Sequence, residues 1–184
     1  MNLIIPMAGR SSRFPGIRPK WMLTHPNGKF MAIEAISGFD LTKFDRIYFV
    51  YLKEHEEEYH FLKGFREGLE DEGLVGKTTM LELPEPTNDQ SETIFQAIKI
   101  GKIKGPFVIK DSDNFFKADI KPGNTICYHD LNNAGLIKPK NKSYLMIDDF
   151  GQVTNIIEKQ VISPYFSVGA YGFEDTELFC STLE

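Results

Sequence analysis

The sequence predicts a three-layer α/β protein, with a mostly parallel sheet between layers of helices. Short apolar runs that suit buried strands alternate with helical patterns up to residue 110. The chain has 184 residues, 41% of them apolar, which is enough for one domain with its own core. Polar loops directly follow two of the apolar runs, and sheets of this kind bind ligands at the ends of their strands.

The alternation begins with two buried strands and one long helix. Residues 3–6 form an apolar run closed by proline, and residues 47–52 form a second run. The charged stretch after residue 52 carries apolar side chains three to four residues apart, which predicts one amphipathic helix. These side chains are Tyr59, Leu62, Phe65 and Leu69.

The next segments repeat the order of strand and helix. Residues 78–83 suit a strand, and residues 84–89 suit a turn. Asp89 and Glu92 have capping-box spacing at the start of a helix that runs to Gly101. Residues 106–110 are a further buried strand, which ends at Asp111. The polar loops at 8–13 and 111–114 therefore both lie at carboxyl ends of strands.

Shorter segments follow residue 121 and predict antiparallel or mixed strands. They cover residues 143–147, 153–157 and 167–173, with a turn at 149–151. The sequence shows no internal repeat, low-complexity tract or linker between this part and the first. We therefore expect one domain over residues 1–184.

The charge distribution favours a small anionic ligand over nucleic acid. The 21 basic residues are outnumbered by 26 acidic ones, for a net charge of −5, which disfavours wrapping by nucleic acid. Residues 1–33 nevertheless carry five basic side chains and no carboxylate. The five are Arg10, Arg13, Arg18, Lys20 and Lys29.

The sequence gives no sign of disulfides, secretion or membrane insertion. Cys127 and Cys180 have neither CxxC spacing nor a paired pattern with histidine. The N-terminus lacks the pattern of a secretory signal, and no stretch approaches the roughly 18 apolar residues of a membrane span. We expect a reduced, cytoplasmic protein without a membrane partner, and no feature predicts its oligomeric state.

The first candidate site is the loop Gly9-Arg10-Ser11-Ser12-Arg13. Small residues let the backbone approach a ligand closely, and successive N–H groups can bind phosphate oxygens. Arg13 and Lys20 add positive charge. The alternative is a tight turn with solvated arginines, and the loop alone supports the two interpretations equally.

The second candidate site is Asp111-Ser112-Asp113, where two carboxylates could share a divalent cation with phosphate oxygens and water. A calcium EF-hand is excluded, because Phe115 and Phe116 stand where that loop needs an oxygen ligand and glycine. An Asx turn that closes the strand is the alternative, and the pair alone slightly favours it. A basic loop and an acidic pair at strand ends of one sheet together predict a nucleotide-metal site.

These residues resemble the nucleotidylyltransferases that activate sugar phosphates. The family pattern is an apolar strand, Ala-Gly-x-Gly-x-x-Arg, a variable run with prolines, and then Pro-Lys with an apolar patch. Here Met7-Ala8-Gly9-Arg10-Ser11-Ser12-Arg13 precedes Pro19-Lys20-Trp21-Met22-Leu23. Ser11 replaces the second glycine, and Arg13 falls one position early. Further motifs match in order at Gln90-Ser91-Glu92-Thr93, Asp113, Glu158-Lys159 and Gly169-Ala170-Tyr171-Gly172-Phe173.

The resemblance implies a Rossmann-like fold of the nucleotide-diphospho-sugar transferase type and a reaction. The enzyme would transfer a nucleoside monophosphate from a nucleoside triphosphate to a phosphorylated acceptor and release pyrophosphate, with Mg²⁺ as cofactor. The acceptor would be a sugar 1-phosphate or a related small phosphate, and the pathway the synthesis of capsule or surface-polysaccharide precursors. We expect no nucleic-acid partner, because the net charge is negative.

The resemblance also implies roles for individual residues. Arg13, Lys20 and Asp113 would be catalytic, and Asp111 and Asp113 would hold the metal. Glu158 and Lys159 would bind the acceptor phosphate. The nucleotide would contact Met7, Ala8, Gly9, Arg10, Ser11, Ser12, Gln90, Ser91 and Thr93. Trp21 either anchors the lysine loop in the core or lines the acceptor pocket.

One departure from the family concerns the end of the chain. Family members usually continue beyond this strand and supply a second metal-binding aspartate, whereas this chain ends at Glu184. The expected domain is either a shortened form or one that lacks its C-terminal portion. Two other functions remain as alternatives. One is a metal-dependent glycosyltransferase with a DxD pair, which has less use for the basic loop, and the other is a non-catalytic nucleotide-binding module.

Overall fold

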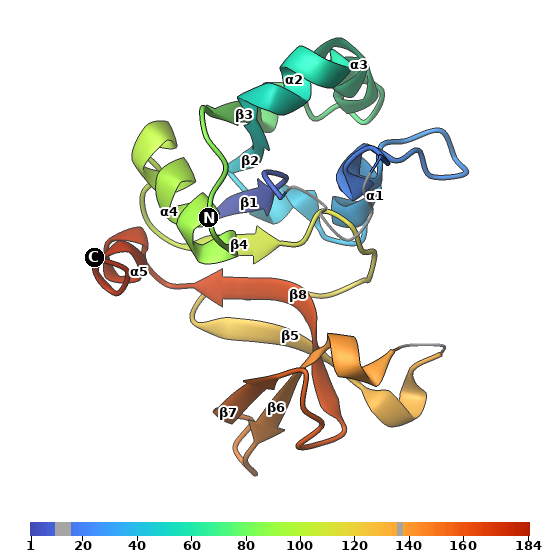
Figure 1. Ribbon diagram of the computed structural model, residues 1–184. Coiled ribbons are helices and arrows are strands. Elements are labelled where there is room, and N and C mark those ends of the chain that lie inside the picture. Colours follow the sequence, from blue (N-terminus) through green and yellow to red (C-terminus); the bar gives the residue numbers. More distant parts are fainter. Residues whose placement is uncertain (10–15, 136–137) are drawn as a thin grey trace. The chain divides into compact units, whose positions relative to one another are not determined.

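The computed structural model describes residues 1–9, 16–135 and 138–184 (Figure 1). The strands are β1 (Asn2–Pro6), β2 (Arg46–Leu52), β3 (Thr78–Leu83), β4 (Phe107–Lys110), β5 (Thr125–Asp130), β6 (Ser143–Ile147), β7 (Val153–Glu158) and β8 (Tyr165–Phe173). The helices are α1 (Met31–Ile36), α2 (Lys53–Tyr59), α3 (Leu62–Asp71), α4 (Gln90–Gly101) and α5 (Thr176–Ser181). Single 3₁₀ turns occur at η1 (Lys20–Met22), η2 (Leu41–Lys43), η3 (Val75–Lys77), η4 (Leu131–Asn133) and η5 (Pro139–Asn141).

The strands form a mixed sheet in the order β3-β2-β1-β4-β8-β6-β7, and β5 also pairs with β8. This arrangement confirms the predicted α/β fold class. The chain divides into two compact units, which are described separately. Unit 1 comprises Met1–Thr125 and Tyr171–Glu184, and unit 2 comprises Ile126–Ala170.

The sheet of unit 1 is built from parallel neighbours. β1 pairs with β2 and with β4, and β2 pairs with β3, all in parallel. The carboxyl ends of β1 to β4 therefore lie at one edge of the sheet, which we call the carboxyl edge, and their starts lie at the amino edge. The chain proceeds from β1 to β2 and β3 on one side, whereas β4 lies on the other side. The strand order reverses between the neighbouring strands β1 and β4. Open α/β sheets bind ligands at such a switch point.

Helices cover both faces of this parallel sheet. On one face, Ile94 and Ile98 of α4 belong to the same core cluster as Val50 of β2. On the other face, the Phe65 ring of α3 packs edge-on against Phe49 of β2, with 5.0 Å between ring centroids. Phe49 and Val50 are consecutive residues of one strand, so their side chains point to opposite faces. This confirms the three-layer arrangement within unit 1.

The single long helix predicted after residue 52 is wrong, because the chain forms two helices there. α2 ends at Tyr59, and the next residue, His60, adopts a left-handed conformation (φ 48°) and donates its N–H to the Glu56 carbonyl at 3.0 Å. The Glu56 carboxylate in turn accepts the N–H of Leu62 at 3.0 Å, at the start of α3. The break lets Phe61 pack edge-on against Trp21 and Tyr51, with ring centroids 4.8 and 5.3 Å apart.

Unit 2 confirms the predicted antiparallel strands. β6 pairs in antiparallel fashion with both β7 and β8. Its core contains Tyr144 and Leu145 of β6 with Phe166 of β8, all buried. The Tyr144 hydroxyl donates to the Pro139 carbonyl at 3.1 Å, so this tyrosine belongs to the core of unit 2. None of the helices in the described ranges has the length and hydropathy needed to cross a membrane.

Candidate functional site

The two loops predicted to form a site leave adjacent strands at the carboxyl edge. Ile4 of β1 pairs with Ile109 of β4, so the two strands end side by side. The Met7 N–H donates to the Val50 carbonyl at 2.7 Å, which holds the chain against β2 for one more residue. Met7 and Ala8 are buried, and Gly9 is exposed with open space where a Cβ would stand. Arg10, Ser11, Ser12 and Arg13 lie outside the described residues, so their roles stay predictions.

Lys20 and Asp113 meet at this edge. The Lys20 Nζ donates to Asp113 Oδ2 at 3.0 Å, although 93 residues separate the two in sequence. Both side chains are partly exposed, at 34% and 37%, so solvent and a ligand can reach them. The structure thus brings together a cation from the lysine loop and an acid from the loop after β4.

Trp21 fixes the backbone next to Lys20. Its side chain is buried, edge-on to Phe61 and tilted against His55 at 5.7 Å between ring centroids. Burial lowers the pKa of His55, so its ring stays neutral in this cluster. Of the two interpretations of Trp21, the structure favours the hydrophobic anchor.

Gln90 joins the start of α4 to the acidic loop. Asp89 caps the helix by accepting the Glu92 N–H at 2.9 Å, which confirms the predicted cap. The Glu92 carboxylate accepts the N–H of Asn88 at 2.7 Å, one residue earlier than the reciprocal bond of a standard capping box. Gln90, the first helical residue, then donates its Nε2 to Asp111 Oδ1 at 2.8 Å. The predicted nucleotide segment and the predicted metal pair are therefore in direct contact.

The other two residues predicted for the nucleotide segment point elsewhere. Ser91 is exposed and lines a separate pocket with Phe95 and Gln96. Thr93 is buried, and its hydroxyl lies 2.6 Å from that of Thr87 and donates to the Asp89 carbonyl at 3.1 Å. The structure brings neither to Asp111, and their nucleotide contacts stay predictions.

Lys110 is a residue that sequence reasoning missed. It is the last residue of β4 and is fully buried. Its Nζ donates to the carbonyls of Asp111 and Asn114 at 2.8 and 2.9 Å, and also to Asn114 Oδ1. The one available signal was a lysine at the end of an apolar strand, directly before the acidic pair.

The acidic pair Asp111 and Asp113 is predicted to hold a cation together with phosphate. No set of three or more histidine, cysteine, aspartate or glutamate side chains converges within the described ranges. Asp111 and Asp113 alone supply too few ligands for a dedicated metal cage. Mg²⁺ is commonly held by one or two carboxylates together with substrate phosphates and water. Asp111 and Asp113 would provide the carboxylates.

The predicted acceptor residues lie in unit 2, at the end of β7. Lys159 has a left-handed backbone conformation (φ 61°), and its Nζ lies 2.7 Å from Glu158 Oε1. Both side chains are largely exposed. Their role in acceptor binding stays a prediction.

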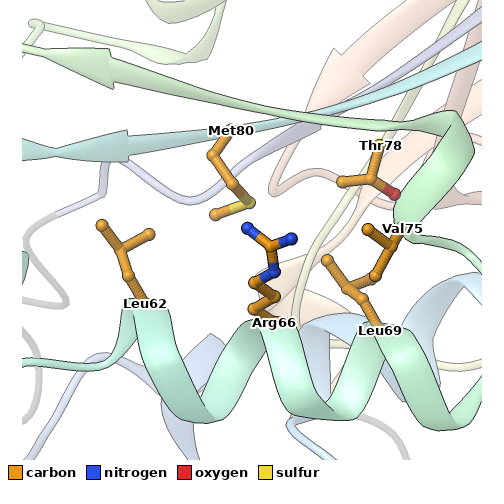
Figure 2. Close-up of a pocket in the computed structure, with 6 residues that line it drawn as sticks. All are labelled: Leu62, Arg66, Leu69, Val75, Thr78 and Met80. Carbon is orange, nitrogen blue, oxygen red and sulfur yellow. The ribbon is translucent and has the colours of Figure 1, made fainter.

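A pocket of about 270 Å³ between α3 and β3 has a different character (Figure 2). Leu62, Leu69, Val75 and Met80 give it apolar walls. Figure 2 shows the Arg66 guanidinium between Met80 and Thr78, and its Nε also pairs with Glu70 at 3.2 Å. Among the predicted site residues that the structure describes, none lines this pocket, so it differs from the site indicated by the sequence.

No protein-family profile matches the chain, and no curated protein matches its sequence. Solved structures do match. A nucleoside-diphosphate-sugar pyrophosphorylase from Vibrio cholerae superposes with a TM-score of 0.74 at 22% identity, over 98% of this chain and 76% of that one. An inositol-1-phosphate CTP transferase from T. maritima gives 0.72 at 14% identity, over 97% and 71%. A Bacillus anthracis protein assigned as a glucose-1-phosphate thymidylyltransferase gives 0.72 at 19% identity, over 100% and 75%.

These similarities confirm the predicted resemblance at the level of the fold. The chain has the α/β fold found in pyrophosphorylases and nucleotidyltransferases that act on sugar and inositol phosphates. At these identities the comparison establishes the fold, and function has to be argued from the site.

Proposed function

We propose that this chain is a nucleotidylyltransferase that binds a nucleoside triphosphate at the carboxyl edge of unit 1. It transfers the nucleoside monophosphate to a small phosphorylated acceptor and releases pyrophosphate. The observation that carries the proposal is the 3.0 Å contact between Lys20 Nζ and Asp113 Oδ2 beside the switch point. It gathers the two charges that a metal-bound polyphosphate needs, a cation for phosphate oxygens and an acid for the metal.

The reaction needs no covalent intermediate on the protein. An oxygen of the acceptor phosphate attacks the α-phosphorus, the bond from that phosphorus to the β-phosphate oxygen breaks, and pyrophosphate leaves in line. The barrier comes from bringing two polyanions together and from charge that moves onto the leaving group. Positioning and electrostatic stabilisation should therefore supply most of the catalysis.

The chain's own residues divide this work. The predicted contacts of Arg13 and of the backbone amides from Gly9 to Ser12 hold the triphosphate, and Met7 and Ala8 lie beside the base. Asp111 and Asp113 would hold Mg²⁺, which would supply charge neutralisation for the phosphate oxygens. Gln90 orients the Asp111 carboxylate through its 2.8 Å hydrogen bond.

Under this proposal the Lys20 ammonium binds Asp113 first and a phosphate oxygen of the ligand afterwards. Without ligand, its ammonium neutralises Asp113. When the triphosphate binds, the ammonium moves to a phosphate oxygen and leaves Asp113 available to the cation. Metal and nucleotide therefore enter most favourably as one complex.

The acceptor side is proposed from the resemblance. Glu158 and Lys159 would bind the phosphate of a sugar 1-phosphate or a related small molecule. We place the reaction in the cytoplasm, in the supply of nucleotide-activated precursors for a capsule or surface polysaccharide.

A pyrophosphate-release screen tests the proposal. ATP, CTP, GTP and UTP are each offered with a panel of phosphorylated sugars and alcohols, with and without Mg²⁺. We expect Mg²⁺-dependent release for one combination of base and acceptor. Consumption of a nucleotide-sugar without pyrophosphate would support a glycosyltransferase instead, and tight nucleotide binding without turnover would support a binding module.

A further inference from the structure

Lys110 is a buried cation placed directly behind the acidic pair. Its side chain ends inside the loop that follows β4, where it reaches the carbonyls of Asp111 and Asn114 at 2.8 and 2.9 Å. These two carbonyls bracket Ser112 and Asp113 in sequence. One ammonium group therefore ties together both ends of the segment that carries Asp113.

An aromatic ring contributes to the enclosure of this ammonium. The Nζ lies 4.7 Å from the centroid of the Phe116 ring, within cation–π range. Phe116 is held by Phe39, edge-on at 5.5 Å between centroids. The loop also approaches Gly38 closely, because a Cβ there would stand 2.0 Å from the Phe116 carbonyl oxygen. The loop is thus clamped by the buried cation and by the turn after α1.

The burial of Lys110 indicates that its positive charge has a structural role that an apolar side chain could not fill. A fully buried ammonium is costly to desolvate unless its donors are satisfied, and an apolar side chain of similar length would fill the same space without that cost. What only the ammonium supplies is a set of short bonds to loop oxygens. These bonds fix the backbone on which both carboxylates stand, and catalytic groups lose rate when displaced by about an ångström.

We propose that Lys110 is a positioning residue for the Asp111 and Asp113 carboxylates. It acts through the backbone of the loop and does not touch the substrate. Its consequence for turnover rests on the proposed nucleotidyl transfer, whereas its ordering of the loop can be measured without any substrate.

The test uses Lys110→Met, which keeps the length and removes the ammonium. Lys104→Met is the matched control, since Lys104 is exposed and precedes the same strand. Amide hydrogen exchange followed by mass spectrometry reports on residues 111–117, and pyrophosphate release reports on turnover. We expect Lys110→Met to speed exchange of this segment at least about tenfold, with β1, β2 and α4 unchanged. Turnover should fall about 10- to 100-fold, as for lost supporting contacts in catalytic and metal sites.

A second variant guards against failure of the first to fold. Asn114→Leu removes one acceptor of the ammonium and leaves Lys110 in place, and it should move both measurements in the same direction by a smaller factor. Unchanged exchange in residues 111–117, or faster exchange with full turnover, would overturn the positioning role. If the wild-type chain releases no pyrophosphate in any combination, the nucleotidyl transfer is wrong, and the exchange arm alone decides whether Lys110 orders the loop.

Discussion

Unit 1 carries two similar lysine–aspartate pairs on opposite edges of its sheet. Lys20 meets Asp113 at the carboxyl edge, and Lys43 meets Asp119 at the amino edge, where η2 leads into β2. The second pair joins η2 to the segment at residues 119–120, because Lys43 also donates to the Ile120 carbonyl at 3.4 Å. Ion pairing is thus common to both edges. The carboxyl edge adds Asp111, which accepts from Gln90, the open position at Gly9 and the switch point between β1 and β4.

The charged groups next to the amino-edge pair also hold segments of the chain together. The N-terminal ammonium pairs with Asp45 at 2.6 Å, and Lys77 donates to the carbonyls of Leu41 and Phe44 at 3.0 Å each. Hydrogen bonding to Asp119 raises the pKa of Lys43, and the same contact lowers the pKa of Asp119. The two pairs therefore differ in their place at the sheet and in the groups beside them, and these differences are why we propose a functional role for the pair at the carboxyl edge alone.

The largest expected effect comes from removing one acid of the carboxyl edge. Asp113→Asn should lower pyrophosphate release about 10²- to 10³-fold, because the metal and the moving charge lose a carboxylate. Asp119→Asn, the matched change at the amino edge, should leave turnover near wild type. Equal losses in the two variants, measured under the same metal and substrate concentrations, would erase the distinction between the edges.

Lys20→Met should cost about 10² in turnover, since a stabilising cation is lost from the reacting phosphates. The same change should tighten Mn²⁺ binding in the absence of nucleotide, because no ammonium then competes for Asp113. Electron paramagnetic resonance of free Mn²⁺ measures this directly. Lys43→Met is the control and should alter neither quantity. Weaker Mn²⁺ binding in Lys20→Met would contradict the proposed exchange of partners.

Gln90→Leu tests the hydrogen bond that Gln90 donates to Asp111 at the carboxyl edge. Loss of the hydrogen bond to Asp111 should lower turnover about 10- to 100-fold, as for other groups that orient a metal ligand. Gln96→Leu, farther along α4, should have little effect. A Gln90→Leu variant with full turnover at limiting Mg²⁺ would show that Asp111 needs no orientation from the helix.

The smallest effect concerns stability at the amino edge. Because the pKa of Asp119 is lowered in the folded chain, its contribution is present above the unfolded pKa and is lost as pH falls through the folded value. The difference in urea midpoint between wild type and Asp119→Asn should therefore be small at about pH 7 and should shrink as the pH falls below the ordinary pKa of aspartate. A difference that grows on acidification would reverse this assignment.

The sequence predicts most of the strands because their signal is local. The runs at 3–6, 47–52 and 106–110 are apolar, short and closed by polar or proline residues, and each occurs as a buried strand of the parallel sheet. The rule that parallel strands end at one edge was then enough to place Asp111 near the end of β1. The sequence pattern does not reveal the helix break at His60. Apolar residues keep their helical spacing across the break, although His60 itself adopts a left-handed backbone conformation.

Other features depend on partners that no sequence pattern encodes. α1 is only 6 residues long, too short for a periodic signal, and β5 was missed because its side chains are largely exposed or half-buried. Lys110 binds mainly backbone carbonyls, which every residue type possesses, so nothing in the sequence names its partners. The contact of Lys20 with Asp113 spans 93 residues and becomes visible only in the folded chain.

The most direct measurement of the central claim is a crystal structure with Mn²⁺ and a non-hydrolysable nucleoside triphosphate, with the manganese located by anomalous scattering. We expect manganese to be coordinated by Asp113 and phosphate oxygens, the triphosphate to lie beside Gly9, and the Lys20 ammonium to contact a phosphate. A nucleotide seated in the apolar pocket between α3 and β3, or manganese remote from Asp113, would contradict it.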